Sequence, residues 1–282
     1  MDDQTAPPAP PATARARMTA VPILGMHRSG TSMLTRALNL LGLELGSPLM
    51  PPQPDNPKGF WENEFFWGIN VQILRAMNIH MSGYGRAADL LAVPERCSLV
   101  ERTDDNLRAI QAYLDRTFQA PVWGWKDPRS VLLFPFWLSV LGDLGYRRLR
   151  PVAVARHPAA CTGSLARRGD LRPLADAAGL SPEALALDMW KAYSRALLAI
   201  CDETNCFVTL QDWLIDRETA GPELRRCARY VGLGGGVDLR PALEWVDPSS
   251  VHHRAADGAL ADDESLALHA QFEARARLQQ NG

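Results

Sequence analysis

The chain has 282 residues, of which 46% are hydrophobic and 22% charged, a composition that supports one domain with a sizeable buried core. Its formal net charge of −2 lacks the basic excess on which nucleic-acid-binding proteins depend, so nucleic acid is not an expected partner. The five cysteines form no C-x-x-C pair, which indicates free thiols in a reducing, cytoplasmic compartment rather than a zinc site.

The two ends of the chain differ in composition from its middle. Residues 1–20 are rich in proline and alanine and poor in large apolar side chains, which predicts a disordered tail without a signal peptide. No run approaches the ~18 consecutive apolar residues that a membrane-spanning helix needs. We expect residues 21–248 to form one α/β domain, and residues 249–282 to form a coil and a helix that packs on the domain or at a homodimer contact. The oligomeric state stays open.

The domain is predicted to begin with a strand, a loop and a helix. Residues 21–24 are apolar and partly β-branched, and apolar residues recur at helical spacing over 33–41. Between them lies the loop G-M-H-R-S-G-T-S, Gly25 to Ser32. Its glycines let successive N–H groups point inward, and the following helix N-terminus adds partial positive charge. The loop therefore predicts a phosphate or sulfate site, to which Arg28 adds a matching pair of donors.

The glycine spacing of this loop is that of the Walker A motif, G-x-x-x-x-G-K-[ST]. Gly25 and Gly30 occupy the two glycine positions, but Thr31 stands where the motif has lysine. Without that lysine the β- and γ-phosphates lose their main point charge. An ordinary kinase or NTPase is therefore disfavoured, although not excluded.

The rest of the chain alternates between helical and strand patterns. Helices are predicted over 60–78, 99–118, 131–141, 158–168, 185–201, 222–230 and 262–278, and strands over 121–125, 152–155 and 206–210. A proline-rich loop (47–59) and an irregular segment or lid (81–95) interrupt the alternation. Strands that alternate with helices predict a P-loop-containing three-layer sandwich, with a central parallel sheet flanked by helices.

Polar clusters follow three of the predicted strands. They are the loop Gly25 to Ser32, the run Lys126 to Arg129 and the run Arg156 to Pro158. Ligands of parallel α/β sheets bind beyond the carboxyl ends of the strands. We therefore expect the three clusters to line one site.

These clusters resemble motifs of the sulfotransferases that use 3′-phosphoadenosine 5′-phosphosulfate (PAPS). The resemblance covers about residues 21–233. It is best to the branch of the family whose loop carries an arginine, which includes the tyrosylprotein sulfotransferases and many bacterial relatives. The loop G-M-H-R-S-G-T-S is similar to their 5′-phosphosulfate loop, and V-A-V-A-R-H-P-A-A-C-T-G-S places Arg156 and Ser164 at the spacing of their 3′-phosphate signature. The histidine base of the cytosolic enzymes has no counterpart near Lys126, and their C-terminal G-x-x-G-x-x-K stretch is absent, which leaves the adenine contacts open.

The resemblance implies that PAPS is the donor and adenosine 3′,5′-bisphosphate the product. It implies catalytic roles for Glu62 as general base, Lys126 as the contact of the transferring sulfuryl group and Arg28 as a further cation. No metal is implied. The implied cofactor-binding residues are His27, Arg28, Ser29, Gly30, Thr31, Ser32, Arg156 and Ser164.

The sequence leaves the base, the acceptor and the reaction class open. Glu64 and His27 are rival bases, and Glu62 could merely complement the dipole of the predicted helix that begins at residue 60. The acceptor could be a hydroxyl or amine of a small molecule, glycan or lipid. Two alternative functions are a P-loop kinase-like phosphotransferase that has replaced its lysine and a non-catalytic nucleotide-binding module.

Overall fold

The computed structural model describes residues 12–53, 56–234, 236–246 and 260–280. Its strands are β1 (Thr19–Leu24), β2 (Val122–Lys126), β3 (Arg148–Leu149), β4 (Val152–Ala155) and β5 (Phe207–Leu210). They form one sheet in the order β2-β1-β4-β5, with β3 also beside β1, and every pairing is parallel. The loops that follow β1, β2, β4 and β5 therefore leave the sheet at the same edge.

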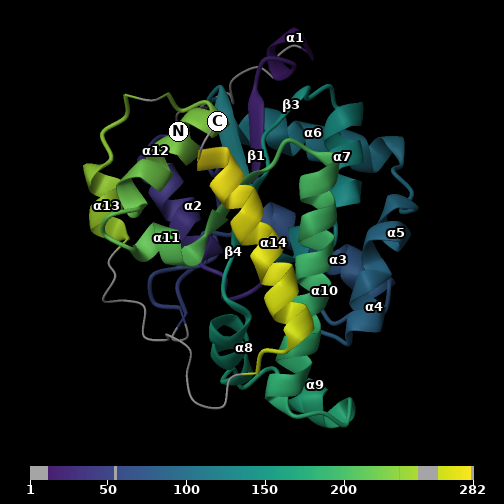
Figure 1. Ribbon diagram of the computed structural model, residues 1–282. Helices are drawn as coiled ribbons and strands as arrows, with labels where there is room; N and C mark the ends of the chain where they lie inside the picture. The colour runs from purple at the N-terminus through teal and green to yellow at the C-terminus, as the bar shows by residue number, and fades with distance from the viewer. Residues whose placement is uncertain (1–11, 54–55, 235, 247–259, 281–282) are drawn as a thin grey trace.

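Helices cover both faces of this sheet (Figure 1). One face carries α2 (Thr31–Leu40), α11 (Gln211–Ile215), α12 (Ala220–Val231) and α13 (Arg240–Trp245). The other face carries α3 (Glu64–Ala76), α6 (Asp104–Thr117), α7 (Phe134–Asp143), α10 (Pro182–Glu203) and α14 (Asp263–Gln280). The remaining helices are α1 (Ala12–Arg15), α4 (Ala87–Leu91), α5 (Val93–Ser98), η1 (Pro128–Val131), α8 (Pro158–Ala166) and α9 (Arg172–Ala177).

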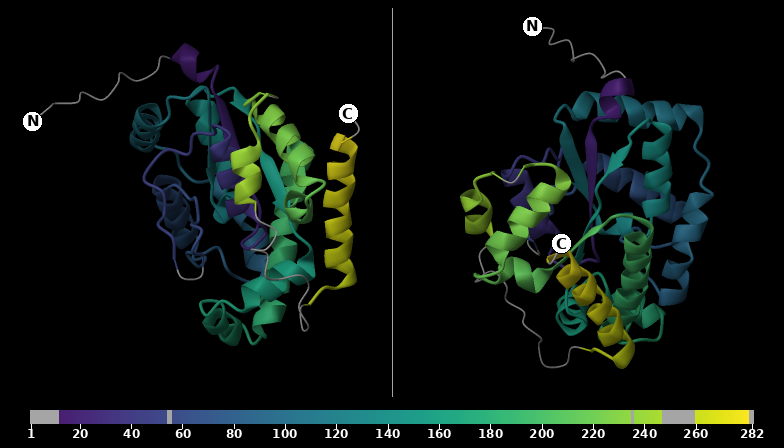
Figure 2. Two further views of the ribbon diagram at one scale, coloured as in Figure 1. Left: turned by 90° about the vertical axis from the view of Figure 1, so that its left-hand side faces the viewer. Right: turned by 45° about the horizontal axis from the view of Figure 1, so that its top comes forward.

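Alternating side chains of β1 explain the two layers of core. Val21 and Ile23 pack with the α2 and α12 side, whereas Ala20 and Leu24 pack with the α3, α7 and α10 side. Successive residues of a strand point to opposite faces, so an uninterrupted apolar strand must be covered on both. The predicted three-layer arrangement of helices about a parallel sheet is confirmed, and its layers can be followed in Figure 2.

The N-terminal part of the fold begins earlier than predicted. Residues 1–11 lie outside the described residues, but the expectation of a disordered tail is wrong for residues 12–20. Met18 is buried, and Arg15 forms an ion pair of 2.9 Å with the Asp115 carboxylate. Local composition did not indicate this order, because the stabilising partner lies 100 positions away along the chain.

The predicted helix over 60–78 is shorter in the structure and begins at Glu64. Asn63 is its N-cap, and the side-chain oxygen of Asn63 accepts a hydrogen bond from the Phe65 N–H. Glu62 therefore precedes the helix and does not belong to its first turn. This corrects the interpretation in which Glu62 only complements the helix dipole, and leaves Glu64 in that position.

Two other segments also differ from expectation. Residues 81–95, predicted to be irregular, contain α4 and the start of α5. The final helix, predicted to end at residue 278, extends to Gln280 and packs on α10 and β5, and its residues His269, Phe272 and Ala276 are buried. The coil predicted from residue 249 lies outside the described residues as far as residue 259. Within the described ranges, no helix combines the length and apolar character needed to cross a membrane.

Candidate active site

The carboxyl ends of the strands open into a pocket of about 220 Å³. Its lining includes every residue predicted for the site except Ser29, a buried residue of the loop. The predicted residues at the pocket are His27, Arg28, Gly30, Thr31, Ser32, Glu62, Lys126, Arg156 and Ser164. The structure thus brings together the three polar clusters and adds a fourth segment, which precedes α3.

The loop Gly25 to Ser32, called the phosphate loop below after its predicted ligand, has left-handed backbone at its sharp turn. Gly30 has a φ of 90° and is the N-cap of α2. A Cβ atom at this position would lie 2.7 Å from Cγ of Gln211, so glycine also permits the close approach of β5 and α11. Arg28 has a φ of 66°, a conformation that costs an L residue free energy and is often found at functional sites. The first N–H groups of α2 and the Arg28 side chain therefore share one end of the pocket.

The arginines and the serine of the two phosphate signatures meet at this loop. The Arg28 Nε atom donates to the Ser164 hydroxyl over 3.0 Å, and one terminal nitrogen of Arg156 donates to the Arg28 carbonyl over 2.8 Å. Arg156 follows β4 directly, and Ser164 lies two turns along α8. Both of these acceptors are neutral oxygen atoms, and the Asp212 charge also acts on Arg156. Positive charge is thus gathered where the helix dipole of α2 also favours an anion.

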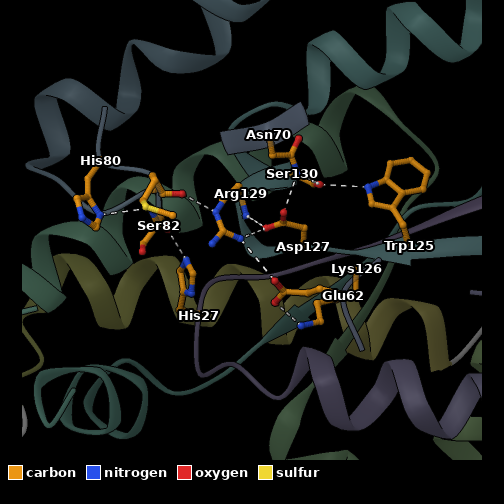
Figure 3. Close-up of polar contacts among 12 residues, drawn as sticks. His27, Glu62, Asn70, His80, Ser82, Trp125, Lys126, Asp127, Arg129 and Ser130 are labelled. Atoms are coloured by element: carbon orange, nitrogen blue, oxygen red, sulfur yellow. Dashed lines mark hydrogen bonds and ion pairs between the residues drawn. The ribbon is translucent and has the colours of Figure 1, made fainter. Parts of the chain in front are cut away.

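Glu62 and Lys126 form a second wall of the pocket and belong to a buried ion-pair network (Figure 3). The Lys126 ammonium lies 2.7 Å from one Glu62 oxygen, and an Arg129 terminal nitrogen lies 3.5 Å from the other. The same Arg129 nitrogen lies 2.7 Å from the Asp127 carboxylate. All four side chains are buried, so each charge needs its partners to offset the cost of desolvation.

Burial of Glu62 raises the pKa of its carboxyl above the usual value, and the nearby Asp127 charge adds to that rise. Lys126 and Arg129 oppose it. A carboxylate whose pKa is raised toward neutrality is a better proton acceptor at physiological pH. Among the three candidate bases, the exposed Glu64 does not line the pocket.

His27 is engaged in a backbone contact. Its Nε2 atom lies 2.9 Å from the Ser82 carbonyl, which can only accept, so this nitrogen carries the ring proton. The ring packs edge-on against Tyr84 at 5.0 Å and Tyr193 at 6.1 Å. Burial, with repulsion from Arg129, holds the pKa of His27 well below its usual range. The imidazole is therefore neutral at pH 7.

Sequence reasoning missed several residues of the pocket wall. Trp245 comes from the C-terminal α13 and lies edge-on to Trp61 at 6.0 Å. The Lys58 ammonium is 5.2 Å from the Trp245 ring centroid, and the Arg36 guanidinium is 4.5 Å from that of Trp61. No local signal marks these residues, because their shared position arises from the packing of α13 against α2. The other lining residues missed are Met33, Asn56, Gly59, Phe60, Arg168 and Gln211.

Comparisons with known proteins bear on the fold. No protein-family model matches the chain, and no curated protein matches it. Two solved structures align with 91% of it, each with a TM-score of 0.50. One is the sulfotransferase domain from the Synechococcus PCC 7002 olefin synthase, 16% identical and covered over 95% of its length. The other is the sulfotransferase domain from the curacin biosynthetic pathway, 13% identical and covered over 98%. The chain has the fold of these sulfotransferase domains.

Proposed function

We propose that this protein is a PAPS-dependent sulfotransferase that acts on a hydroxyl or amine of a small molecule, glycan or lipid. One observation carries the proposal: a single pocket joins a phosphate loop and two arginines to a buried lysine–carboxylate pair. The sulfotransferase fold of the chain supports it. The rival function, a kinase-like phosphotransferase, would use the same loop without the lysine of the Walker motif.

The residues at the loop fit an adenosine bisphosphate carrying a sulfuryl group. The α2 N-terminus and Arg28 would hold the 5′-phosphosulfate, and Arg156 with Ser164 would hold the 3′-phosphate. Because Arg28 and Arg156 donate to neutral oxygens, phosphate oxygens could replace these acceptors and strengthen the bonds. When bound, the donor would supply the sulfuryl group.

The Glu62 and Lys126 wall would accept the proton of the acceptor group and stabilise the negative charge that develops during transfer. Glu62 would accept the proton of the acceptor hydroxyl as a new oxygen–sulfur bond forms and the sulfur–oxygen bond to the bisphosphate breaks. Lys126 would stabilise negative charge on the oxygens of the sulfuryl group. Its 2.7 Å contact with Glu62 places base and cation side by side. Proton transfer would weaken this ion pair and make the ammonium a stronger partner for the transferring group.

Calorimetric titration tests the proposal against the kinase alternative. We expect adenosine 3′,5′-bisphosphate to bind without magnesium, and more tightly than ATP with magnesium. Preference for magnesium–ATP would overturn the sulfotransferase assignment. Binding of the bisphosphate, with no transfer of labelled sulfate from PAPS to any acceptor in a broad screen, would instead favour a non-catalytic nucleotide-binding module.

A further inference from the structure

Arg129 stands at the centre of the buried network, although no phosphate signature includes it. Its side chain contacts three groups: the Asp127 carboxylate at 2.7 Å, the Glu62 carboxylate at 3.5 Å and the Met81 carbonyl, to which Nε donates over 2.7 Å. The guanidinium is about as buried as the two carboxylates. One rigid fork thus joins the end of β2, the segment before α3 and the segment that follows it.

The two carboxylates explain why a cation is needed at this point. Glu62 and Asp127 are close enough for the charge on Asp127 to raise the pKa of Glu62. Like charges in a shared buried site favour protonation of one of them. A single terminal nitrogen of Arg129 faces both carboxylates and offsets that repulsion. With Lys126, the four groups carry two positive and two negative charges.

Asp127 fixes Arg129 in turn. It is fully buried, accepts the Arg129 backbone N–H over 2.9 Å and accepts the Asn70 amide over 2.9 Å. The Asn70 oxygen is occupied by the indole N–H of Trp137 at 2.8 Å. These hydrogen bonds fix the orientation of the Asp127 carboxylate, and the carboxylate in turn fixes the orientation of the Arg129 guanidinium.

The segment that Arg129 contacts is also tied to the phosphate loop. Three consecutive carbonyls accept hydrogen bonds from three different elements: Met81 from Arg129, Ser82 from His27 and Gly83 from the Tyr193 hydroxyl at 2.9 Å. His27 belongs to the phosphate loop. Residues 81–83 therefore connect the ion-pair network to the loop that carries His27 through their backbone. The contact between His27 and Ser82 can be followed in Figure 3.

We propose that Arg129 is the positioning residue of this site: it keeps the Glu62 carboxylate ionised and beside Lys126, and it anchors the backbone of residues 81–83 between the two walls. Its catalytic consequence rests on the proposed function, whereas its effects on Glu62 and on this backbone do not. The chain offers a matched control in Arg15, whose side chain also joins a buried aspartate, Asp115, to a backbone carbonyl, that of Leu144 at 3.1 Å. That pair lies outside the pocket lining.

The test compares Arg129→Met, Arg129→Lys and Arg15→Met in the full chain. Carbon-13 NMR of labelled glutamate, assigned with Glu62→Gln, reports the pKa of Glu62, and hydrogen exchange reports the backbone of residues 81–83. We expect Arg129→Met to raise the Glu62 pKa by about one unit or more, because an opposite charge is lost. In Arg129→Lys the Glu62 pKa should rise by no more than about half as much as in Arg129→Met, because lysine keeps the positive charge. Both changes at Arg129 should speed exchange over 81–83.

Activity measurements then separate positioning from stability. In Arg129→Met the acid limb of the kcat–pH profile should move to higher pH with the Glu62 pKa, while bisphosphate affinity stays within about threefold of wild type. Arg15→Met should lower thermal stability and leave the Glu62 pKa, the exchange of residues 81–83 and the pH profile unchanged.

Two outcomes would overturn the proposal. One is an unchanged Glu62 pKa in Arg129→Met, and the other is a shift of the same size in Arg15→Met. Should Arg129→Met not fold, wild-type exchange rates over 81–83 in Arg129→Lys would overturn it instead. If wild type binds no bisphosphate, the proposed function fails, but the NMR and exchange results still decide the role of Arg129.

Discussion

The two walls of the pocket hold similar cations in opposite electrostatic settings. On the phosphate-loop wall, Arg28 donates to a hydroxyl and Arg156 to a carbonyl, both neutral. On the other wall, Lys126 faces the carboxylate of Glu62, and Arg129, which lies outside the pocket lining, pairs with Asp127 and Glu62. The first wall combines these cations with the N-terminus of α2, which favours an anion, whereas the second wall pairs two cations with two carboxylates.

Because of this difference, we expect the two walls to have different roles. A cation that already has a carboxylate partner contributes little to the affinity for a further anion, but it can set the pKa and orientation of that partner. Mutations on the phosphate-loop wall should therefore act mainly on ligand affinity. Mutations on the Glu62 wall should act mainly on turnover and on its pH dependence.

The largest effect is expected from Glu62→Gln. This change keeps the shape of the side chain and an oxygen that can accept from Lys126, but it removes the base. Turnover should fall by roughly 10²- to 10⁴-fold, while bisphosphate affinity stays within about threefold. The matched control is Glu64→Gln, two residues further on and exposed, which should change neither quantity by more than about twofold. Loss of turnover in Glu64→Gln but not in Glu62→Gln would reverse the assignment of the base.

Lys126→Met tests the same wall through its cation. Turnover should fall by about 10²- to 10³-fold, because a donor to the developing charge is lost. The Glu62 pKa should rise as well, since an opposite charge disappears, so the acid limb of the pH profile should move to higher pH. A kcat–pH profile together with calorimetric titration of the bisphosphate provides both readouts. A loss confined to affinity would place Lys126 with the anion-binding wall.

Arg156→Ala should act in the opposite way and reduce affinity more than turnover. Loss of one charge-assisted contact costs ~1.5–3 kcal/mol, or about ten- to a hundredfold in affinity. The bisphosphate should be weakened by this factor relative to adenosine 5′-phosphosulfate, which has no 3′-phosphate. Direct titration of both ligands makes the comparison. Equal weakening of the two would show that Arg156 supports the loop through its bond to the Arg28 carbonyl without reading the 3′-phosphate.

The smallest effect concerns His27, which links the two walls. Its lowered pKa means that the folded protein holds it neutral, whereas the unfolded chain protonates it below about pH 6.5. The stability gained from neutral His27 is therefore complete above this pH and is lost as pH falls toward the folded-state pKa. Between pH 7.5 and 5.5, wild type should lose about 1 kcal/mol relative to His27→Gln in urea unfolding. A constant difference over this range would contradict the neutral, donating imidazole.

The amino-acid sequence by itself determined the fold class and most of the phosphate-loop wall. The apolar strand before Gly25, the helical period after Thr31 and the interval from Arg156 to Ser164 are local patterns, each set by the geometry of one strand, turn or helix. Because parallel strands end at one edge, such patterns also predict which loops share a site.

The tertiary structure alone decided which contacts the side chains of the other wall make. The sequence offered Glu62, Glu64 and His27 as candidate bases, and in the structure the helix begins only at Glu64, so that Glu62 precedes it. The sequence indicated Arg129 only as part of the polar run after β2, and it gave no signal for Trp245. The contacts of these two residues with Glu62 and Trp61 join segments that are far apart along the chain. Ion pairs and ring contacts of this kind depend on how helices pack around the sheet. Hydrophobic periodicity specifies which face of a helix is buried, but it does not specify which buried side chains meet.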